Sequence, residues 1–245
     1  MFYEINVKKA ISRTKIPVSY YTINPYIGCT VGCRYCFAQF IGQFKNTTGK
    51  WGKDVYIKKN LIEVLDREIG KTPYRNFFIS TNCDAYQHIE KKYELTRNIL
   101  KRLISYDFPI FIMTKSNLIL RDIDLLKLSK KVYIMITVTT DNDDVRKIFE
   151  PGANSIPERI ELIEKLNGQN IPTDAFIGPA LPMNSKRLAN RLVNLVGKVH
   201  IDDLNYKYRV RDLYKKYKLE KWLNEESFTR IKNDFSEVFG KDRIS

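Results

Sequence analysis

Three cysteines close together near the N-terminus are the residues of this chain best suited to bind a metal centre. Cys29, Cys33 and Cys36 belong to the run CTVGCRYC and have the spacing C-x3-C-x2-C. Three thiolates on one short loop can ligate three corners of a [4Fe–4S] cube, which leaves the fourth iron without a protein ligand. Gly32 permits a positive φ where the loop must fold tightly. The spacing predicts an iron–sulfur site with one open iron, where chemistry can take place.

Zinc and disulfides are the alternatives for these thiols. A structural zinc site needs a fourth ligand, and the remaining candidates are Cys83, His88 and His200, all distant in sequence. Neither histidine has a recognisable metal-binding spacing, so we expect structural roles for both. Three cysteines this close cannot all pair as disulfides, and the N-terminus MFYEINVKK lacks the apolar core of a signal peptide. We therefore expect reduced thiols and a cytoplasmic protein.

The same loop resembles the cluster loop of the radical S-adenosylmethionine (SAM) enzymes, whose pattern is C-x3-C-x-aromatic-C. Tyr35 supplies the aromatic residue. The resemblance implies a [4Fe–4S] cluster on Cys29, Cys33 and Cys36, with SAM chelating the open iron. It also implies that an external low-potential reductant drives cleavage of SAM to methionine and a 5′-deoxyadenosyl radical, which abstracts hydrogen from a substrate. The protein then supplies orientation and excludes water.

Composition bounds the size of the protein and the chemistry of its partners. The length of 245 residues predicts one domain, residues 1–245, and no apolar run reaches the ~18 residues needed to cross a bilayer. Lysine and arginine number 42 against 28 acidic residues, a formal net charge of +14. Such an excess favours a DNA or RNA partner. Genome composition or heat adaptation is the alternative explanation for the charge.

Strand-like and helix-like segments alternate along the chain, which predicts an α/β fold with a parallel sheet. The predicted strands are residues 17–23, 77–80, 109–113, 132–138, 173–177 and 199–204. The predicted helices are residues 58–69, 90–104, 122–129, 156–166 and 186–196, followed by two C-terminal helices. Six such units suggest a partial (β/α)6 TIM-like barrel that is not closed. Its site should lie at the carboxyl ends of the strands, and the cysteine loop (residues 24–40) follows the first strand.

Polar residues follow several of these strands and are candidates to bind SAM. Thr81 and Asp84 follow the second strand, Lys115 the third, and Thr137 and Thr139 end the fourth. We expect the segment after the second strand to bind the methionine end, the lysine to meet the carboxylate, and the threonine hydroxyls to bond the ribose. Exposed backbone at residues 178–182 would lie near the adenine. Ordinary loop, surface and strand-forming roles are the alternatives.

Together these segments carry a narrower resemblance, to the spore photoproduct lyase-like branch of the radical SAM proteins. It covers residues 24–184 and rests on the run at 24–40, on Asp84 with Tyr86 and Gln87, on TKSNLILRD at 114–122, and on FEPG at 149–152 with Arg159. The resemblance implies a radical SAM core and a lyase or repair-type reaction.

Cys83 marks a departure from that branch. The lyase has a hydrogen-donating cysteine at the position of Thr81 and a serine close to SAM at the position of Cys83. A thiol at residue 83 could still return a hydrogen atom to a product radical, with different geometry. The alternative is a small cysteine that only packs.

A basic segment follows the last predicted strand. Residues 205–221, NYKYRVRDLYKKYKLEK, begin a C-terminal helical region (205–245) and interleave tyrosine with lysine and arginine. The cations could contact phosphates while the tyrosines stack on bases. For the aromatic residues we favour an amphipathic helix with Tyr208, Leu213, Tyr217 and Leu219 packed inward.

The sequence thus predicts a radical SAM enzyme that acts on a nucleic acid. The same enzyme class with a peptide or small-metabolite substrate is the first alternative. A zinc-stabilised nucleic-acid-binding protein without catalysis is the second.

Overall fold

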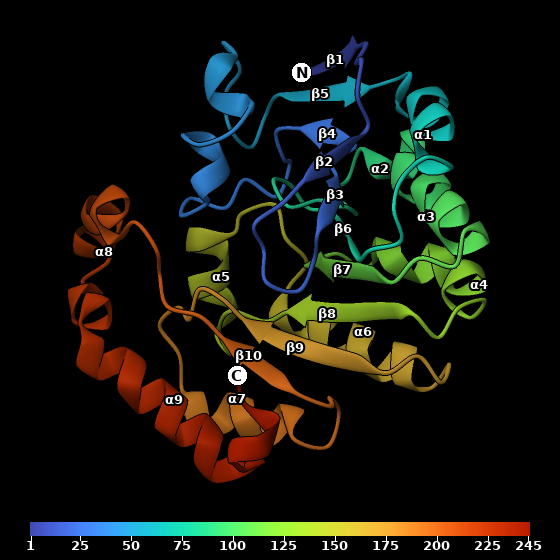
Figure 1. Cartoon of the computed structure of the whole chain (residues 1–245). Coiled ribbons are helices and arrows are strands. Elements are labelled where there is room, and N and C mark those ends of the chain that lie inside the picture. Colours follow the sequence, from blue (N-terminus) through green and yellow to red (C-terminus); the bar gives the residue numbers. More distant parts are fainter. The chain divides into compact units, whose positions relative to one another are not determined.

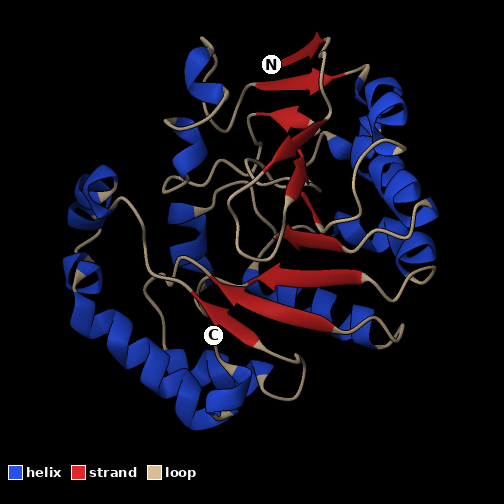
Figure 2. Ribbon diagram, viewed as in Figure 1, coloured by secondary structure: helices blue, strands red, loops and turns tan.

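Parallel strands alternate with helices along the chain, as the sequence predicts (Figures 1 and 2). The computed structural model describes residues 1–245. All six predicted strands form: β3 (Tyr21–Ile23), β6 (Phe77–Ile79), β7 (Ile110–Thr114), β8 (Val132–Thr137), β9 (Thr173–Ile177) and β10 (Val199–Ile201). The α/β fold class is confirmed.

The chain divides into two units. The first comprises Met1–Gly32 and Ala38–Ile134, and the second comprises Cys33–Phe37 and Met135–Ser245. The chain crosses from one unit to the other within the cysteine loop, returns after residue 37, and crosses again within β8.

The first unit contains two sheets. In one, β3 pairs in parallel with β6, β6 pairs in parallel with β7, and β2 (Ile11–Arg13) runs antiparallel to β3 at the edge. The matched register of Ile23, Ile79 and Ile112 brings the carboxyl ends of β3, β6 and β7 to one edge. The other sheet has the order β1 (Phe2–Ile5), β5 (Val55–Lys58), β4 (Tyr26–Ile27). The sequence analysis did not predict this second sheet.

Helices α1 (Leu61–Ile69) and α3 (Leu95–Ser105) pack against each other in the first unit (Figure 1). The single helix predicted over 90–104 is interrupted, because α2 (Glu90–Tyr93) ends where Glu94 adopts a left-handed φ of 50°. The buried carboxylate of Glu90 then accepts bonds from the backbone N–H groups of Thr96 and Arg97, at 3.0 and 3.2 Å, and so caps α3. The helix predicted over 122–129 is the shorter α4 (Ile123–Leu126), preceded by a 3-10 helix at Asn117–Asp122.

In the second unit the strands follow the order β8, β9, β10, and β9 pairs in parallel with β10. Helix α6 (Ile156–Asn167) starts with a capping box between Ser155 and Glu158. The other helices are α5 (Asp143–Phe149), which was not predicted, α7 (Ser185–Leu192), α8 (Arg211–Lys216) and α9 (Glu225–Phe239). Helices α7 and α9 lie side by side (Figure 1).

The inward packing expected for Tyr208 and Tyr217 is wrong. Tyr208 is 67% exposed and Tyr217 is 38% exposed. Val210 and Tyr214, one helical turn apart, occupy the buried positions instead. None of the helices combines the length and apolar character that a membrane span requires.

Candidate functional site

The cysteine loop is a tight turn with three thiols that form no disulfide. Cys29 and Cys33 are buried and Cys36 is partly exposed. The N–H of Gly32 donates to the carbonyl of Cys29, and the N–H of Cys36 to that of Cys33, both at 3.2 Å. Gly32 has the predicted positive φ, 63°. Gly28 also has a positive φ, 90°, and a Cβ there would lie 2.4 Å from the carbonyl oxygen of Asp54, so only glycine fits.

Gln87 fixes the part of the loop that belongs to the first unit. Its Oε1 accepts from the N–H of Thr30 at 2.8 Å, and its Nε2 donates to the carbonyl of Gly28 at 3.2 Å. These two residues flank Cys29. One buried amide side chain therefore orients the backbone on both sides of the first thiol.

Asp84 links the same thiol to the end of β7. Its N–H donates to Cys29 Sγ at 3.3 Å. Its carboxylate accepts from the hydroxyl of Thr114 at 2.6 Å and from the N–H groups of Lys115 and Tyr86 at 2.8 and 2.9 Å. The backbone of Asp84 thus faces the sulfur, while its side chain fixes the turn that carries Lys115.

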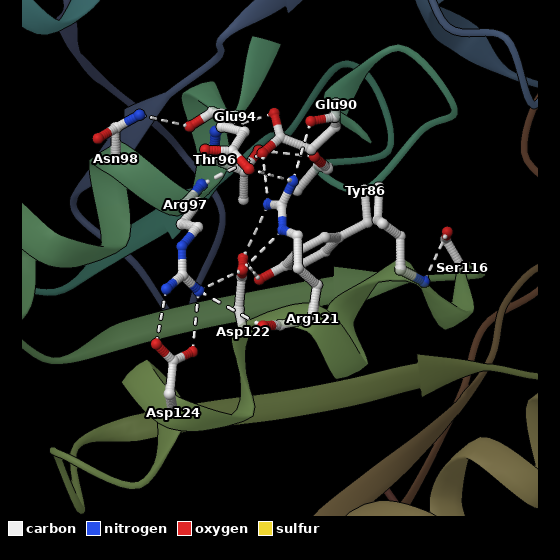
Figure 3. Close-up of polar contacts among 12 residues, drawn as sticks. Tyr86, Glu90, Glu94, Thr96, Arg97, Asn98, Ser116, Arg121, Asp122 and Asp124 are labelled. Carbon is white, nitrogen blue, oxygen red and sulfur yellow. Dashed lines mark hydrogen bonds and ion pairs between the residues drawn. The ribbon is translucent and has the colours of Figure 1, made fainter. Parts of the chain in front are cut away.

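A buried ionic network around Tyr86 (Figure 3) stabilises the segment of the chain to which Asp84 and Gln87 also belong. The hydroxyl of Tyr86 donates to Asp122 Oδ2 at 3.1 Å, and Arg121 binds both Asp122 and Glu90 at 2.8 Å. Arg97 binds Asp122 from the other side, also at 2.8 Å. Both carboxylates are fully buried, and buried charges persist only when they are paired in this way. The network explains why Tyr86 and the LRD end of residues 114–122 occur together in this sequence.

A second set of contacts fixes the part of the loop in the second unit. The N–H of Arg34 donates to the carbonyl of Phe149 at 2.9 Å, and the hydroxyl of Tyr35 donates to Glu150 Oε1. Arg159 Nη2 binds Glu150 Oε2 at 2.6 Å. Burial, reinforced by the negative charges nearby, raises the pKa of Tyr35 well above its usual value, so the phenol stays a donor. The FEPG motif and Arg159 therefore position Tyr35, which lies between two of the cysteines.

Thr137 and Thr139 lie at the carboxyl end of β8, and both hydroxyl groups are buried without a hydrogen-bond partner. Arg159 Nη1 donates to the carbonyl of Thr137 at 3.0 Å, which fixes this end of the strand. An unsatisfied buried hydroxyl costs free energy, so a pair of them at a strand end is suited to a polar ligand. Thr173 also has an unpaired buried hydroxyl, but at the opposite end of its strand.

Thr81 and Cys83 have different surroundings in the first unit. The hydroxyl of Thr81 lies 3.3 Å from both the hydroxyl of Thr22 and Oδ1 of Asn24. Cys83 Sγ lies 3.2 Å from the hydroxyl of Ser80 and packs against an apolar cluster that includes Tyr26. Burial raises the pKa of the Cys83 thiol to about 12, so the thiol is neutral at physiological pH.

The structure thus groups the predicted residues by unit. In the first unit hydrogen bonds join Cys29, Asp84 and the backbone of Lys115, and Thr81 follows β6 at the same sheet edge. In the second unit Cys33 and Cys36 flank Tyr35, which connects through Glu150 and Arg159 to Thr137. His88 has an exposed side chain, and His200 bonds the hydroxyl of Ser245 at 2.5 Å.

Sequence reasoning missed the roles of Gln87, Glu150 and Arg159. One signal for Arg159 was available. It falls on the buried face of α6 with Ile156, Ile160 and Ile163, and an arginine at such a position needs a buried acidic partner. Gln87 is named only as part of the family resemblance, and neither its residue type nor its position predicts the two bonds that it makes to the loop.

In each unit, parallel strands with polar residues at their carboxyl ends are the arrangement of barrel-type α/β proteins, in which sites lie at that end. The sequence profile of the Radical SAM superfamily matches residues 23–187. The chain belongs to this superfamily. Spore photoproduct lyase, solved with a dinucleoside spore photoproduct, has the same fold, with a TM-score of 0.66 at 15% identity over 98% of this chain and 80% of the lyase. The predicted partial barrel is therefore confirmed.

Two relatives are similar in sequence. An uncharacterized protein of Methanocaldococcus jannaschii is 39% identical over 179 residues, 73% of this chain and 67% of that protein. The radical SAM Nalpha-GlyT isomerase of Pseudomonas phage M6 is 28% identical over 159 residues, 64% of this chain. This chain spans 32% of the length of the phage protein.

Proposed function

We propose that this radical SAM enzyme binds a [4Fe–4S] cluster through Cys29, Cys33 and Cys36 and cleaves SAM reductively to act on a nucleic acid. The observation that carries the proposal is the cysteine loop itself. It places three thiols that form no disulfide within eight residues, on a backbone fixed by Gln87 at one end and by Tyr35 and Glu150 at the other.

The residues present suit both cofactors. Thiolates are the ligands that iron–sulfur clusters require, and the N–H of Asp84 faces Cys29 Sγ as hydrogen-bond donors do at cluster sulfurs. When bound, the two cofactors together supply a 5′-deoxyadenosyl radical that abstracts hydrogen. Thr137 and Thr139 would donate to the ribose with the hydroxyls that have no partner in the protein.

In the first unit, Lys115, Thr81 and Asp84 are the residues proposed to bind the methionine end of SAM. Lys115 would meet the carboxylate of the methionine moiety, and the carboxylate of Asp84 fixes the backbone that presents it. Thr81 would line the pocket beside the end of β3. Tyr35 fixes the loop between Cys33 and Cys36. The thiols need a reducing environment, so a cytoplasmic location and an external low-potential reductant are parts of the proposal.

Two observations support a nucleic-acid substrate and a lyase or repair-type reaction. The net charge of +14 favours a polyanion. The lyase with the same fold was solved with a dinucleoside ligand. The competing proposal is a peptide or small-metabolite substrate. In that case the net positive charge of the chain would have no role in substrate binding.

Cys83 is proposed as a hydrogen donor to a product radical. Its neutral thiol, with the pKa raised to about 12, has the S–H bond that such a donor needs. Replacement by alanine should leave SAM cleavage intact and change the product distribution. An unchanged distribution would assign Cys83 to packing alone.

Anaerobic reconstitution tests the proposed function. The purified protein should take up about four irons and four sulfides, and with dithionite and SAM it should release 5′-deoxyadenosine. Alanine at position 29, 33 or 36 should abolish iron uptake, whereas Cys83→Ala should not. Stoichiometric zinc without iron uptake would contradict the proposal and favour the zinc-binding alternative.

A further inference from the structure

The basic segment, residues 205–221, turns aromatic rings outward. It folds as a 3-10 helix at Lys207–Arg209, then α8, and then leads into a 3-10 helix at Glu220–Leu223. Tyr206, Tyr208 and Tyr217 are all exposed. An amphipathic helix that served only to close the core would bury these rings, so their exposure needs another explanation.

Cations accompany the exposed rings. The guanidinium carbon of Arg209 lies 5.3 Å from the ring centroid of Tyr208, and Nζ of Lys216 lies 5.7 Å from that of Tyr217. The segment has seven lysines and arginines against two acidic residues, a net charge of +5. One of these lysines, Lys207, is paired with Asp203 at 2.6 Å. The outer face therefore combines aromatic faces with positive charge.

The inner face anchors this segment beside the cysteine loop. Val210 and Tyr214 belong to an apolar cluster with Phe149 of α5, and the ring centroids of Tyr214 and Phe149 are 4.8 Å apart. Tyr35 of the cysteine loop packs against the same cluster, and the N–H of Arg34 bonds the carbonyl of Phe149 at 2.9 Å. The outward tyrosines are thus carried by an element that packs on the same apolar cluster as Tyr35 of the loop.

We propose that the outer face of the basic segment binds an unpaired, unstacked stretch of nucleic acid. A base stacks on Tyr208, and Arg209, Lys215 and Lys216 contact the phosphates. This inference rests on the proposed function, in which the substrate is a nucleic acid. It adds that the bound stretch of nucleic acid is single-stranded. A base can stack on an exposed ring only if its own face is free, which is so in a single strand and not inside a duplex.

A protein partner fits this face less well. The centres of protein–protein interfaces are apolar and depleted in lysine. Here the apolar residues Val210 and Tyr214 point inward, and the lysines lie outside.

Binding of a short labelled oligothymidylate and of a duplex of equal length to the anaerobically reconstituted full chain tests the surface. Fluorescence anisotropy should show tighter binding of the single strand. Tyr208→Ala should weaken single-strand binding about 5- to 100-fold, the range for loss of one stacked base. Tyr208→Phe should stay within about twofold of the wild type, because the ring is retained.

Charge reversal tests the phosphate interactions. Arg209→Glu and Lys216→Glu should each reduce the log–log salt slope for the single strand by about 0.7 for each phosphate that is no longer neutralised. Tyr133→Ala is the matched aromatic control, because Tyr133 is 51% exposed, lies outside the basic segment and stacks on Phe111. Lys101→Glu, on the exposed side of α3, is the matched charge control.

The outcomes separate this inference from the proposed function. Iron uptake and substrate-independent formation of 5′-deoxyadenosine should be unchanged in Tyr208→Ala, since Tyr208 lies outside the cofactor residues. Equal effects of Tyr208→Ala and Tyr133→Ala, preference for the duplex, or no binding in low salt would overturn the surface assignment. A protein that binds the oligonucleotide through Tyr208 but takes up no iron would instead overturn the proposed function.

Discussion

Arg159 and Glu150 form an ion pair of 2.6 Å in which neither side chain has any exposed surface. The pair is more than a structural contact between α6 and the segment after α5. The second carboxylate oxygen accepts the hydroxyl of Tyr35 from the cysteine loop, and the guanidinium also bonds the carbonyl of Thr137 at 3.0 Å. One buried arginine therefore positions both the loop and the end of β8.

Breaking this ion pair should destabilise the protein strongly. Arg159→Met leaves a buried carboxylate without its cation and should cost about 3–5 kcal/mol of unfolding free energy in urea titrations of the apoprotein. Glu150→Gln/Arg159→Met should recover much of that loss, because the buried charge is then gone. Lys165→Met on the same helix, which breaks an exposed pair with Glu161, should cost no more than about 0.5 kcal/mol. Equal losses in Arg159→Met and Lys165→Met would contradict this account.

Gln87 should control how firmly the proposed cluster is retained. Gln87→Leu removes both bonds that flank Cys29, and Gln87→Glu keeps the acceptor for Thr30 but loses the donor to Gly28. Loss of the groups that orient metal ligands typically lowers metal affinity about 10- to 100-fold. Iron loss to a chelator should be slowest in the wild type, faster in Gln87→Glu and fastest in Gln87→Leu. His88→Ala, at the exposed neighbouring residue, is the control. A Gln87→Leu protein that loses iron no faster than His88→Ala would refute the role of Gln87 in retaining the cluster.

The strand pattern could be predicted because each central strand is a short apolar run between polar or helical segments. Phe77–Ile79 and Thr173–Ile177 are examples, and both form as expected. The sheet of β1, β5 and β4 could not be predicted in this way. Its strands are two to four residues long, and β1 pairs with β5 across more than fifty residues. Only tertiary pairing makes such short segments into strands.

Side-chain capping limited the prediction of the helices and of the site. Residues 90–104 have a helical pattern throughout, but Glu90 caps α3 from within α2 and breaks the helix at Glu94. The cysteines and threonines are predicted as site residues because their residue types and positions suggest chemistry. Gln87 acts through hydrogen bonds to the loop at Thr30 and Gly28, which lie far away in sequence, and no local pattern marks it.

The buried thiol of Cys83 should make stability fall with pH in the alkaline range. Its pKa is raised to about 12 in the folded protein from 9.0 as an isolated group. Above pH 9.0 the unfolded chain releases this proton while the folded chain keeps it. The stability that the protonated thiol contributes is therefore fully present below that pH and is lost progressively towards pH 12. By about pH 10 the loss should be about 1 kcal/mol.

The comparison that isolates this effect is wild type against Cys83→Ala, by urea denaturation in reductant at two pH values. The loss of stability between neutral and alkaline pH should be smaller in the variant, since alanine does not titrate. Parallel pH dependences would show that Cys83 ionises as easily in the folded chain as in the unfolded one.

Removing the unpaired hydroxyl of Thr137 or Thr139 should stabilise the apoprotein but weaken the binding of SAM. Thr→Val keeps the shape of the side chain and removes a buried hydroxyl that has no partner. Each of Thr137→Val and Thr139→Val should therefore stabilise the apoprotein by about 1 kcal/mol in denaturant titrations. If these hydroxyls bond the ribose, each variant should also bind SAM about 3- to 10-fold more weakly in anaerobic calorimetry, because one hydrogen bond is lost.

Thr173→Val is the matched control, since its hydroxyl is equally buried and unpaired but lies at the start of β9 rather than at the end of a strand. It should gain stability and leave SAM affinity unchanged. Stabilised variants at positions 137 and 139 with wild-type affinity for SAM would remove both threonines from the pocket.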